Sequence, residues 1–229
     1  MVFNPLQKVE DAQKKGQFSP NVYQLILKRF HIVTEGIERI EKASGLIYPY
    51  YYIEPTLVIS ASQIELSQFG IFFARTIPVI NNSRLNITIQ ISAALVAYGL
   101  LGTVHAVLAH EFMHYLEIIS RVMRMNVLSD ELSGTLFERT YVDSSRLLQH
   151  ETVFWSDSAL VNHIKTKFPD GFKDLRLEEK VIKNWINTGL PVTKVSVDTN
   201  IIKIPIETMG LMEIDPDIKK KLMNLRKGN

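Results

Sequence analysis

Cysteine is absent from this 229-residue chain. The chain therefore forms no disulfide, offers no thiolate to a metal ion and has no cysteine nucleophile. A strong charge of either sign is also lacking, because 26 Lys and Arg residues are nearly balanced by 24 Asp and Glu, for a net charge of +2. We therefore expect no nucleic acid as a partner. The short basic run at residues 219–221 is interpreted as a solvated helix face.

A long apolar leader is lacking in the first residues, MVFNPLQKVEDAQKKG. This favours an intracellular, cytoplasmic protein over a secreted one. The most apolar stretch, residues 91–109, approaches the length of a membrane span, but Gly99 and Gly102 interrupt it. We interpret this stretch as part of a buried helix and expect no membrane as a partner. The sequence specifies no oligomeric state.

Hydrophobic residues make up 46% of the chain, enough for a substantial core in one domain or in two lobes around a cleft. The hydrophobic periodicity predicts a fold of class α+β, with a helix and several strands in the N-terminal part, a central long helix and a mostly helical C-terminal half. The expected helices cover residues 21–43, 100–124, 144–167, 175–187 and a last segment from Asp215. The expected strands cover residues 56–60, 72–80, 85–92 and two short stretches within 194–209.

The central helix carries the pattern His110-Glu111-Phe112-Met113-His114. On a helix, residues four apart lie above one another on one face, so the two imidazoles can bind one tetrahedral metal ion. Glu111 lies on the flank of that face, where it can take a proton from a metal-activated water. With six histidines in the chain, chance produces this pattern roughly once in a hundred such chains. The alternative interpretation is a pair of core histidines on a buried helix.

The motif and the order of elements resemble the zincin metallopeptidases. The resemblance implies a zincin-like catalytic domain over residues 1–229, with an upper lobe over about 1–125 that holds an N-terminal mixed sheet and the central active-site helix. The lower lobe then covers about 126–229. The segment 85–92 alternates apolar with uncharged polar residues, which predicts a strand with one wet face. In the zincin arrangement it stands where the edge strand that binds the substrate main chain is expected.

The residues beyond the motif indicate which branch of the zincin superfamily the chain resembles. Glu117 and Ser120 stand where the metzincin branch has Gly and His, which excludes that branch. The gluzincin branch, which takes a Glu ligand from a later helix, is favoured. The stretch HETVFWSDSALVNHI at 150–164 resembles the second-helix segment of some gluzincin carboxypeptidases. That resemblance implies Glu151 as the third metal ligand.

Helical spacing alone leaves the third ligand open. It places His150 and Asp157 at the centre of an apolar helix face and Glu151 at its edge. A carboxylate on an apolar face needs a partner, so Asp157 is a metal ligand, an acceptor that orients a motif histidine, or a group bonded to backbone amides or an Arg. The other downstream candidates are Asp130, Glu131, Glu138, Asp143 and His163.

Three further residues of this region bear on a site. His105 faces roughly the opposite side of the helix from His110 and is expected to be a satisfied core histidine. Glu117 shares the face of the motif histidines, where it pairs with a cation, lines the cleft or is solvated. Tyr141 and His163 are possible donors to an oxyanion.

These patterns together predict a zinc-dependent metallopeptidase, a hydrolase acting on a peptide or protein substrate. In this interpretation His110, His114 and Glu151 hold Zn²⁺, and Glu111 is the general base. The alternative is a zincin-fold protein that binds metal in a regulatory or interaction role, without peptidase activity.

Overall fold

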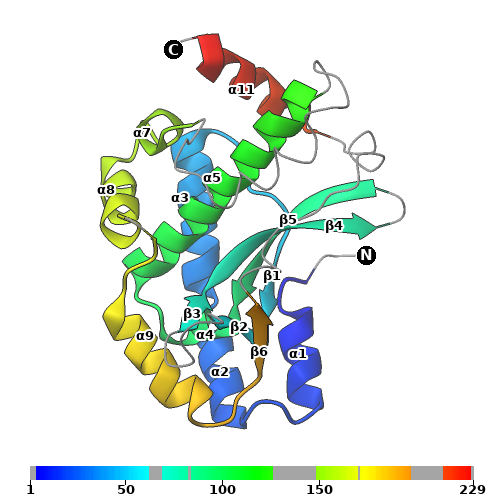
Figure 1. Cartoon of the computed structure of the whole chain (residues 1–229), viewed down its shortest axis with the longest axis vertical. Coiled ribbons are helices and arrows are strands. Elements are labelled where there is room, and N and C mark those ends of the chain that lie inside the picture. Colours follow the sequence, from blue (N-terminus) through cyan, green and yellow to red (C-terminus); the bar gives the residue numbers. More distant parts are fainter. Residues whose placement is uncertain are drawn as a thin grey trace.

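The computed structural model describes residues 4–61, 69–81, 84–125, 148–169, 171–196 and 214–227 (Figure 1). The N-terminal part holds α1 (Gln7–Lys14), α2 (Pro20–Arg29), α3 (His31–Ser44), β1 (Tyr51–Glu54), β2 (Leu57–Ala61), β3 (Phe69–Phe72), β4 (Ala74–Asn81), β5 (Arg84–Ser92), α4 (Ala93–Tyr98) and α5 (Leu101–Met125). The later part holds α7 (His150–Val153), α8 (Ser158–Lys167), α9 (Leu175–Val181), the π-helical turn η2 (Ile182–Ile186), β6 (Val192–Ser196) and α11 (Pro216–Lys227). This mixture of helices and small sheets is compatible with the predicted α+β class.

Two three-stranded sheets are present within the described residues, with strand orders β1-β5-β4 and β3-β2-β6. In the first sheet β5 pairs parallel with β1 and antiparallel with β4, so the sheet is mixed, as predicted. The expectation that 85–92 forms the edge strand is wrong, because β5 lies at the centre of this sheet and β4 lies at its edge. Alternation along a strand reports which face is buried, but it does not report how many neighbours the strand has.

The chain passes from one sheet to the other at a bend on Phe73, between β3 and β4. The single strand expected over 72–80 is therefore divided into two strands that belong to different sheets. Ser92 at the end of β5 donates its backbone N–H to the Phe73 carbonyl at 2.9 Å, which joins the corner to the first sheet. In the second sheet β6 pairs parallel with β2, so a strand from the later part of the chain completes it.

Both faces of β5 are buried from Ile87 to Ser92, whereas Asn86 is exposed. On one face Ile87, Ile89 and Ile91 are at most 5% exposed, as the alternating pattern predicts. On the other face Gln90 is 8% exposed, so the expectation of a wet face is wrong at this position. Side chains of the neighbouring strands cover it: Arg75 of β4 donates to the Gln90 amide oxygen, and the amide nitrogen donates to Glu54 of β1 at 2.8 Å.

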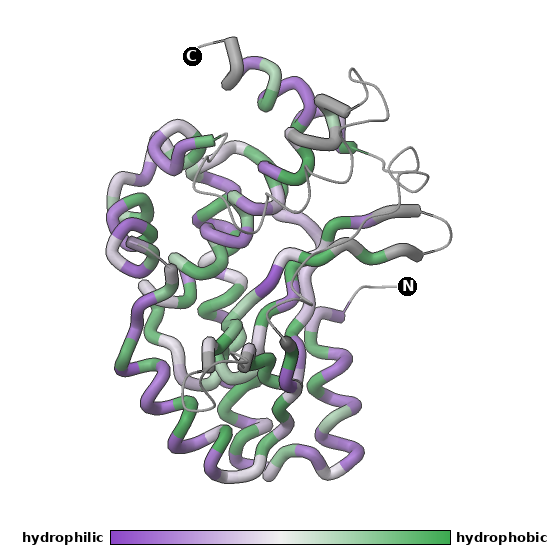
Figure 2. The backbone as a smooth tube through the Cα atoms, viewed as in Figure 1, coloured by the Kyte–Doolittle hydropathy of each residue, from purple (hydrophilic) through white to green (hydrophobic). Residues whose placement is uncertain are grey.

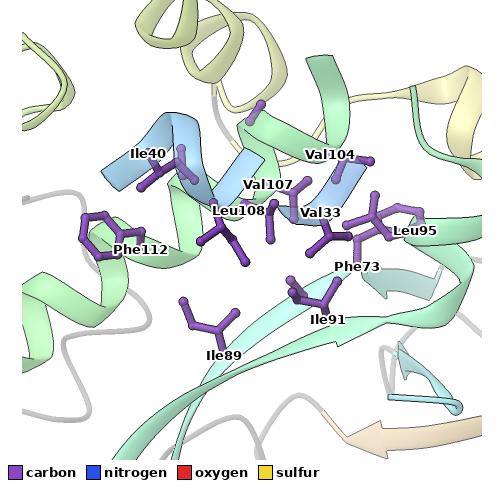
Figure 3. Packing of buried hydrophobic residues seen from close by; sticks show 14 of the residues in the cluster. Val33, Ile40, Phe73, Ile89, Ile91, Leu95, Val104, Val107, Leu108 and Phe112 are labelled. Atoms are coloured by element: carbon purple, nitrogen blue, oxygen red, sulfur yellow. The ribbon is translucent and has the colours of Figure 1, made fainter. Parts of the chain in front are cut away.

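The helix α5 lies at the centre of the hydrophobic core, packed against α3, α8 and the hairpin of β4 and β5. Figure 3 shows side chains from α3, α5 and β5 meeting in one cluster, among them Val33, Ile40, Ile89, Ile91, Val104, Leu108 and Phe112. Along α1 and α9, at the periphery, hydrophobic and hydrophilic stretches alternate in the manner of amphipathic helices (Figure 2). No helix within the described ranges is both long and apolar enough to cross a membrane.

Several predicted helices are divided in the structure. The helix expected over 21–43 forms two helices, α2 and α3, which meet at Phe30. The second helix, α3, ends at Gly45, whose backbone has a left-handed conformation (φ 63°). The last part of the helix expected over 144–167 forms α8. This helix begins after Asp157, because the Asp157 carboxylate accepts a hydrogen bond from Leu160 N and so caps the helix. Residues 144–147 and the strand expected beyond Ser196 lie outside the described residues.

Gly36 allows α3 and α5 to approach each other closely. A Cβ atom at this position would lie 2.7 Å from His105 Cδ2 and 2.8 Å from Leu108 Cδ1. His105 itself is 4% exposed, and its Nε2 lies 3.2 Å from the Ile32 carbonyl oxygen. The interpretation of His105 as a satisfied core histidine is confirmed.

We expect Gly36→Ala to lower the free energy of unfolding by about 1–3 kcal/mol, because the added methyl group overpacks the contact between α3 and α5. A loss of stability would point to the close contact, because Gly-to-Ala changes at exposed helix positions increase the stability. Urea denaturation followed by circular dichroism measures the change, with Glu38→Ala on the exposed side of α3 as the control. A Gly36→Ala protein as stable as the wild type would contradict the close approach.

Candidate active site

The two motif histidines lie side by side on α5, as their spacing predicts. Their Nε2 atoms are 2.9 Å apart and their rings are perpendicular. Two imidazole nitrogens that bind one tetrahedral zinc ion are roughly 3.3 Å apart, given Zn–N bonds of about 2.0–2.1 Å. A small rotation of either ring brings the pair to that separation, so the geometry suits joint coordination of one metal ion.

The orientation of the His110 ring is supported from outside the helix. Phe168, at the C-terminal end of α8, stacks on it with ring centroids 3.8 Å apart and an interplanar angle of 5°. Phe168 in turn contacts Phe172, with centroids 5.3 Å apart. Aromatic stacking of this kind restricts ring rotation, so the segment after α8 helps to fix the direction in which His110 points.

Glu111 is buried, at 8% exposure, and it faces β4. Thr76 Oγ1 lies 2.8 Å from Glu111 Oε2 and 3.0 Å from the Glu111 carbonyl oxygen, so it can donate to either. The strand register explains this contact: Thr76 stands opposite Ile89, and therefore on the sheet face that packs against α5. Burial raises the pKa of Glu111 to about 7, although the Thr76 hydrogen bonds and the charge of Arg75 act in the opposite direction.

A cavity of about 760 Å³ opens beside these three residues. Its walls come from β3, the corner at Phe73, the start of β4, the middle of α5 and the segment from the end of α8 through α9 to η2. The lining residues are Gly70, Ile71, Phe72, Phe73, Ala74, Arg75, Val107, His110, Glu111, His114, Phe168, Gly171, Phe172, Glu178 and Ile182. The motif therefore lies on the wall of a cavity large enough for a side chain of a bound peptide.

The structure does not bring Glu151 to the two histidines. Glu151 lies on α7 with 49% of its side chain exposed, and its carboxylate forms an ion pair with Lys165 of α8. That pair lowers the pKa of Glu151. Within the described ranges, no group of three or more His, Cys, Asp or Glu side chains is arranged to hold a metal ion. The assignment of Glu151 as the third ligand stays a prediction.

Asp157 has an arginine partner. Arg39 of α3 donates from Nε at 2.6 Å and from Nη2 at 2.9 Å to the two carboxylate oxygens. These bonds lower the pKa of Asp157. Of the three roles considered for Asp157, the structure therefore shows the ion-paired one, combined with the N-cap of α8. The pair joins α3 to the start of α8, and both helices pack on α5.

The remaining predicted candidates are dispersed. His150 is buried at 8% exposure on α7, while His163 is exposed on α8 and lies next to Gly102 at the start of α5. Glu117 is 5% exposed, with Oε2 4.0 Å from His114 Nδ1. Glu117 is therefore buried beside His114, and the expectation that it is a solvated residue is wrong. Asp130, Glu131, Glu138, Tyr141 and Asp143 lie outside the described residues.

Thr76, Phe168 and Glu178 contribute to this site and were not found from the sequence. Thr76 reaches Glu111 through strand register, and Phe168 reaches His110 through the packing of α8 on α5. Neither Thr76 nor Phe168 belongs to a sequence motif. The polarity of Thr76 on the otherwise apolar face that packs against α5 is a signal, but it can be recognised as one once the strand pairing is known.

Comparisons of the chain with protein-family models, with curated proteins and with solved structures give no match. The geometry of the site therefore carries the functional argument.

Replacement of Thr76 by Val removes the hydroxyl and keeps the shape of the side chain. The lost hydrogen bonds favour the ionised form of Glu111, so we expect the pKa of Glu111 in the metal-free protein to rise above about 7. Carboxyl ¹³C NMR titration measures this pKa. Thr88→Val, a similarly buried change on β5, serves as the control and leaves the pKa in place. An unchanged or lower pKa in Thr76→Val would argue against the contact.

Proposed function

We propose that this protein is a zinc-dependent metallopeptidase, with His110 and His114 as metal ligands and Glu111 as general base. One observation carries the proposal: two imidazole nitrogens 2.9 Å apart and a buried carboxylate line the same cavity of about 760 Å³. A pair of core histidines on a buried helix requires no such cavity. The partly exposed rings of both histidines also favour a site that a ligand can reach.

The donor set fits zinc because neutral imidazole nitrogens are common ligands of this ion. The third protein ligand is a carboxylate in this proposal, with Glu151 as the candidate that the sequence favours. When bound, Zn²⁺ acts as a Lewis acid that acidifies a water molecule and polarises the scissile carbonyl group.

Glu111 performs the proton transfers. Its carboxylate accepts a proton from the attacking water and later gives it to the leaving amine. Burial makes the carboxylate more basic than a solvated Glu, which suits acceptance of a proton near neutral pH. Thr76 holds one carboxylate oxygen, and this contact restricts the orientation of the other.

The edge position of β4 supports a peptide substrate. An edge strand offers backbone N–H and C=O groups to an extended chain, and Ala74 and Arg75 at the start of β4 line the cavity. A peptide added along β4 would pass beside Glu111, because Thr76 follows directly in this strand. The role expected for the edge strand is therefore assigned in this proposal to β4, in place of the segment 85–92.

We expect the protein, purified without a metal-affinity tag, to bind about one zinc ion per chain and His114→Ala to lose it, since one imidazole and a single further ligand hold zinc weakly. Native mass spectrometry with elemental analysis measures the content. His31→Ala is the matched control, because His31 is exposed on α3 and its Nδ1 faces the Lys28 carbonyl oxygen. A wild-type chain that stays free of metal after zinc addition would contradict the site.

We expect Glu111→Gln to retain zinc and to lower kcat for peptide hydrolysis at least about 100-fold, because the amide cannot accept the proton. Hydrolysis of a mixed peptide library, followed by mass spectrometry, measures the activity. Glu35→Gln, an exposed Glu on α3, serves as the control. Bound zinc without hydrolysis in either wild type or variant would instead support the metal-binding protein without peptidase activity.

A further inference from the structure

Glu178 lines the cavity on an element other than the one that carries the motif. It lies on α9, one helical turn after Asp174, whose carboxylate caps α9 and accepts a hydrogen bond from Thr103 at 2.7 Å. Thr103 precedes His110 on α5 by seven residues, or roughly 10 Å along the helix axis. The start of α9 is therefore about two turns of α5 away from the reacting groups. A carboxylate on this element suits the end of a long side chain better than the peptide backbone at the metal.

The cavity wall between these two places is apolar. Ile71 and Phe73 come from β3 and the corner, Val107 from α5, and Phe172 and Ile182 from the segment around α9. Phe73 and Phe172 contact each other with ring centroids 5.0 Å apart. A wall of this kind accepts the methylene stem of Lys or Arg, which packs along apolar surface while the charged end seeks a polar partner.

The charges around Glu178 favour a cation. Partial burial and the neighbouring carboxylate of Asp174 both raise the pKa of Glu178, and a cation beside Glu178 would act in the opposite direction. Lys167, the nearby cation, is held by Asp174 at 2.6 Å. Arg75 also lines the cavity, but its side chain lies on the opposite face of the sheet, where it donates to Gln90. An incoming ammonium or guanidinium group would give Glu178 a partner.

We propose that this cavity is a specificity pocket for Lys or Arg, with Glu178 binding the cationic end of a substrate side chain. The inference rests on the proposed peptidase function, because it assigns the substrate class of the same site. It names Glu178 as a specificity-determining residue and gives it no part in the chemical steps.

The test uses the zinc-loaded full chain and a peptide library that varies the residues on both sides of the scissile bond. We expect cleavage to require Lys or Arg at one fixed position. Glu178→Gln should lower kcat/KM for a Lys-containing peptide at least about tenfold, while the value for the matching Leu peptide changes less than about threefold. Glu178→Lys should prefer a Glu-containing peptide. Glu179→Gln, an exposed change at the next residue, is the control and keeps the wild-type preference.

The possible failures are distinguishable. Cleavage by the wild type without preference for basic residues, or a preference that survives Glu178→Gln, overturns the pocket assignment and leaves the peptidase proposal standing. Loss of zinc from Glu178→Gln assigns Glu178 to metal binding and also overturns the specificity role. Absence of cleavage of every peptide by the zinc-loaded wild type overturns both proposals.

Discussion

Burial of α5 is the constraint on which the rest of the structure depends. The helix packs against α3, α8 and the hairpin of β4 and β5, while His110, Glu111 and His114 face the cavity. Tyr48 donates from its hydroxyl group to the Leu108 carbonyl oxygen at 3.0 Å and stacks on Phe112. These contacts restrict rotation and sliding of the helix. The positions at His110, Glu111 and His114 are therefore set by packing on other faces of the same helix.

The burial of the ionised Glu111 carboxylate lowers the stability of the folded protein. A rise of its pKa from 4.5 to about 7 means that the fold disfavours the ionised carboxylate by about 3 kcal/mol relative to the unfolded chain. By linkage this cost is absent below pH 4.5 and is complete once the pH exceeds about 7. Thr76 offsets part of it. A costly ionisable group beside a cavity is typical of a functional site, since a purely structural core has no need of one.

Much of the element order followed from the sequence. Hydrophobic periodicity located α5 and β5 within one or two residues, because both have long, regular patterns. The division of 72–80 at Phe73, the break near Phe30 and the start of α8 at Asp157 were not predicted. The division at Phe73 depends on strand pairing with segments distant in the chain, and the Asp157 carboxylate that caps α8 is also held by Arg39 of α3. The central place of β5 also depended on a distant partner, β1.

By itself, the sequence determined the helix that carries His110, Glu111 and His114 and the fact that the two imidazoles share one face. This follows from helical geometry, which is local and repeats every 3.6 residues. Tertiary structure alone decided that Thr76 holds Glu111, that Phe168 stacks on His110, that Asp157 pairs with Arg39, and that Glu178 lines the cavity. These contacts join residues 35 to 118 positions apart or different secondary structure elements. Local periodicity carries no information about such distances, because strand register and helix packing set them.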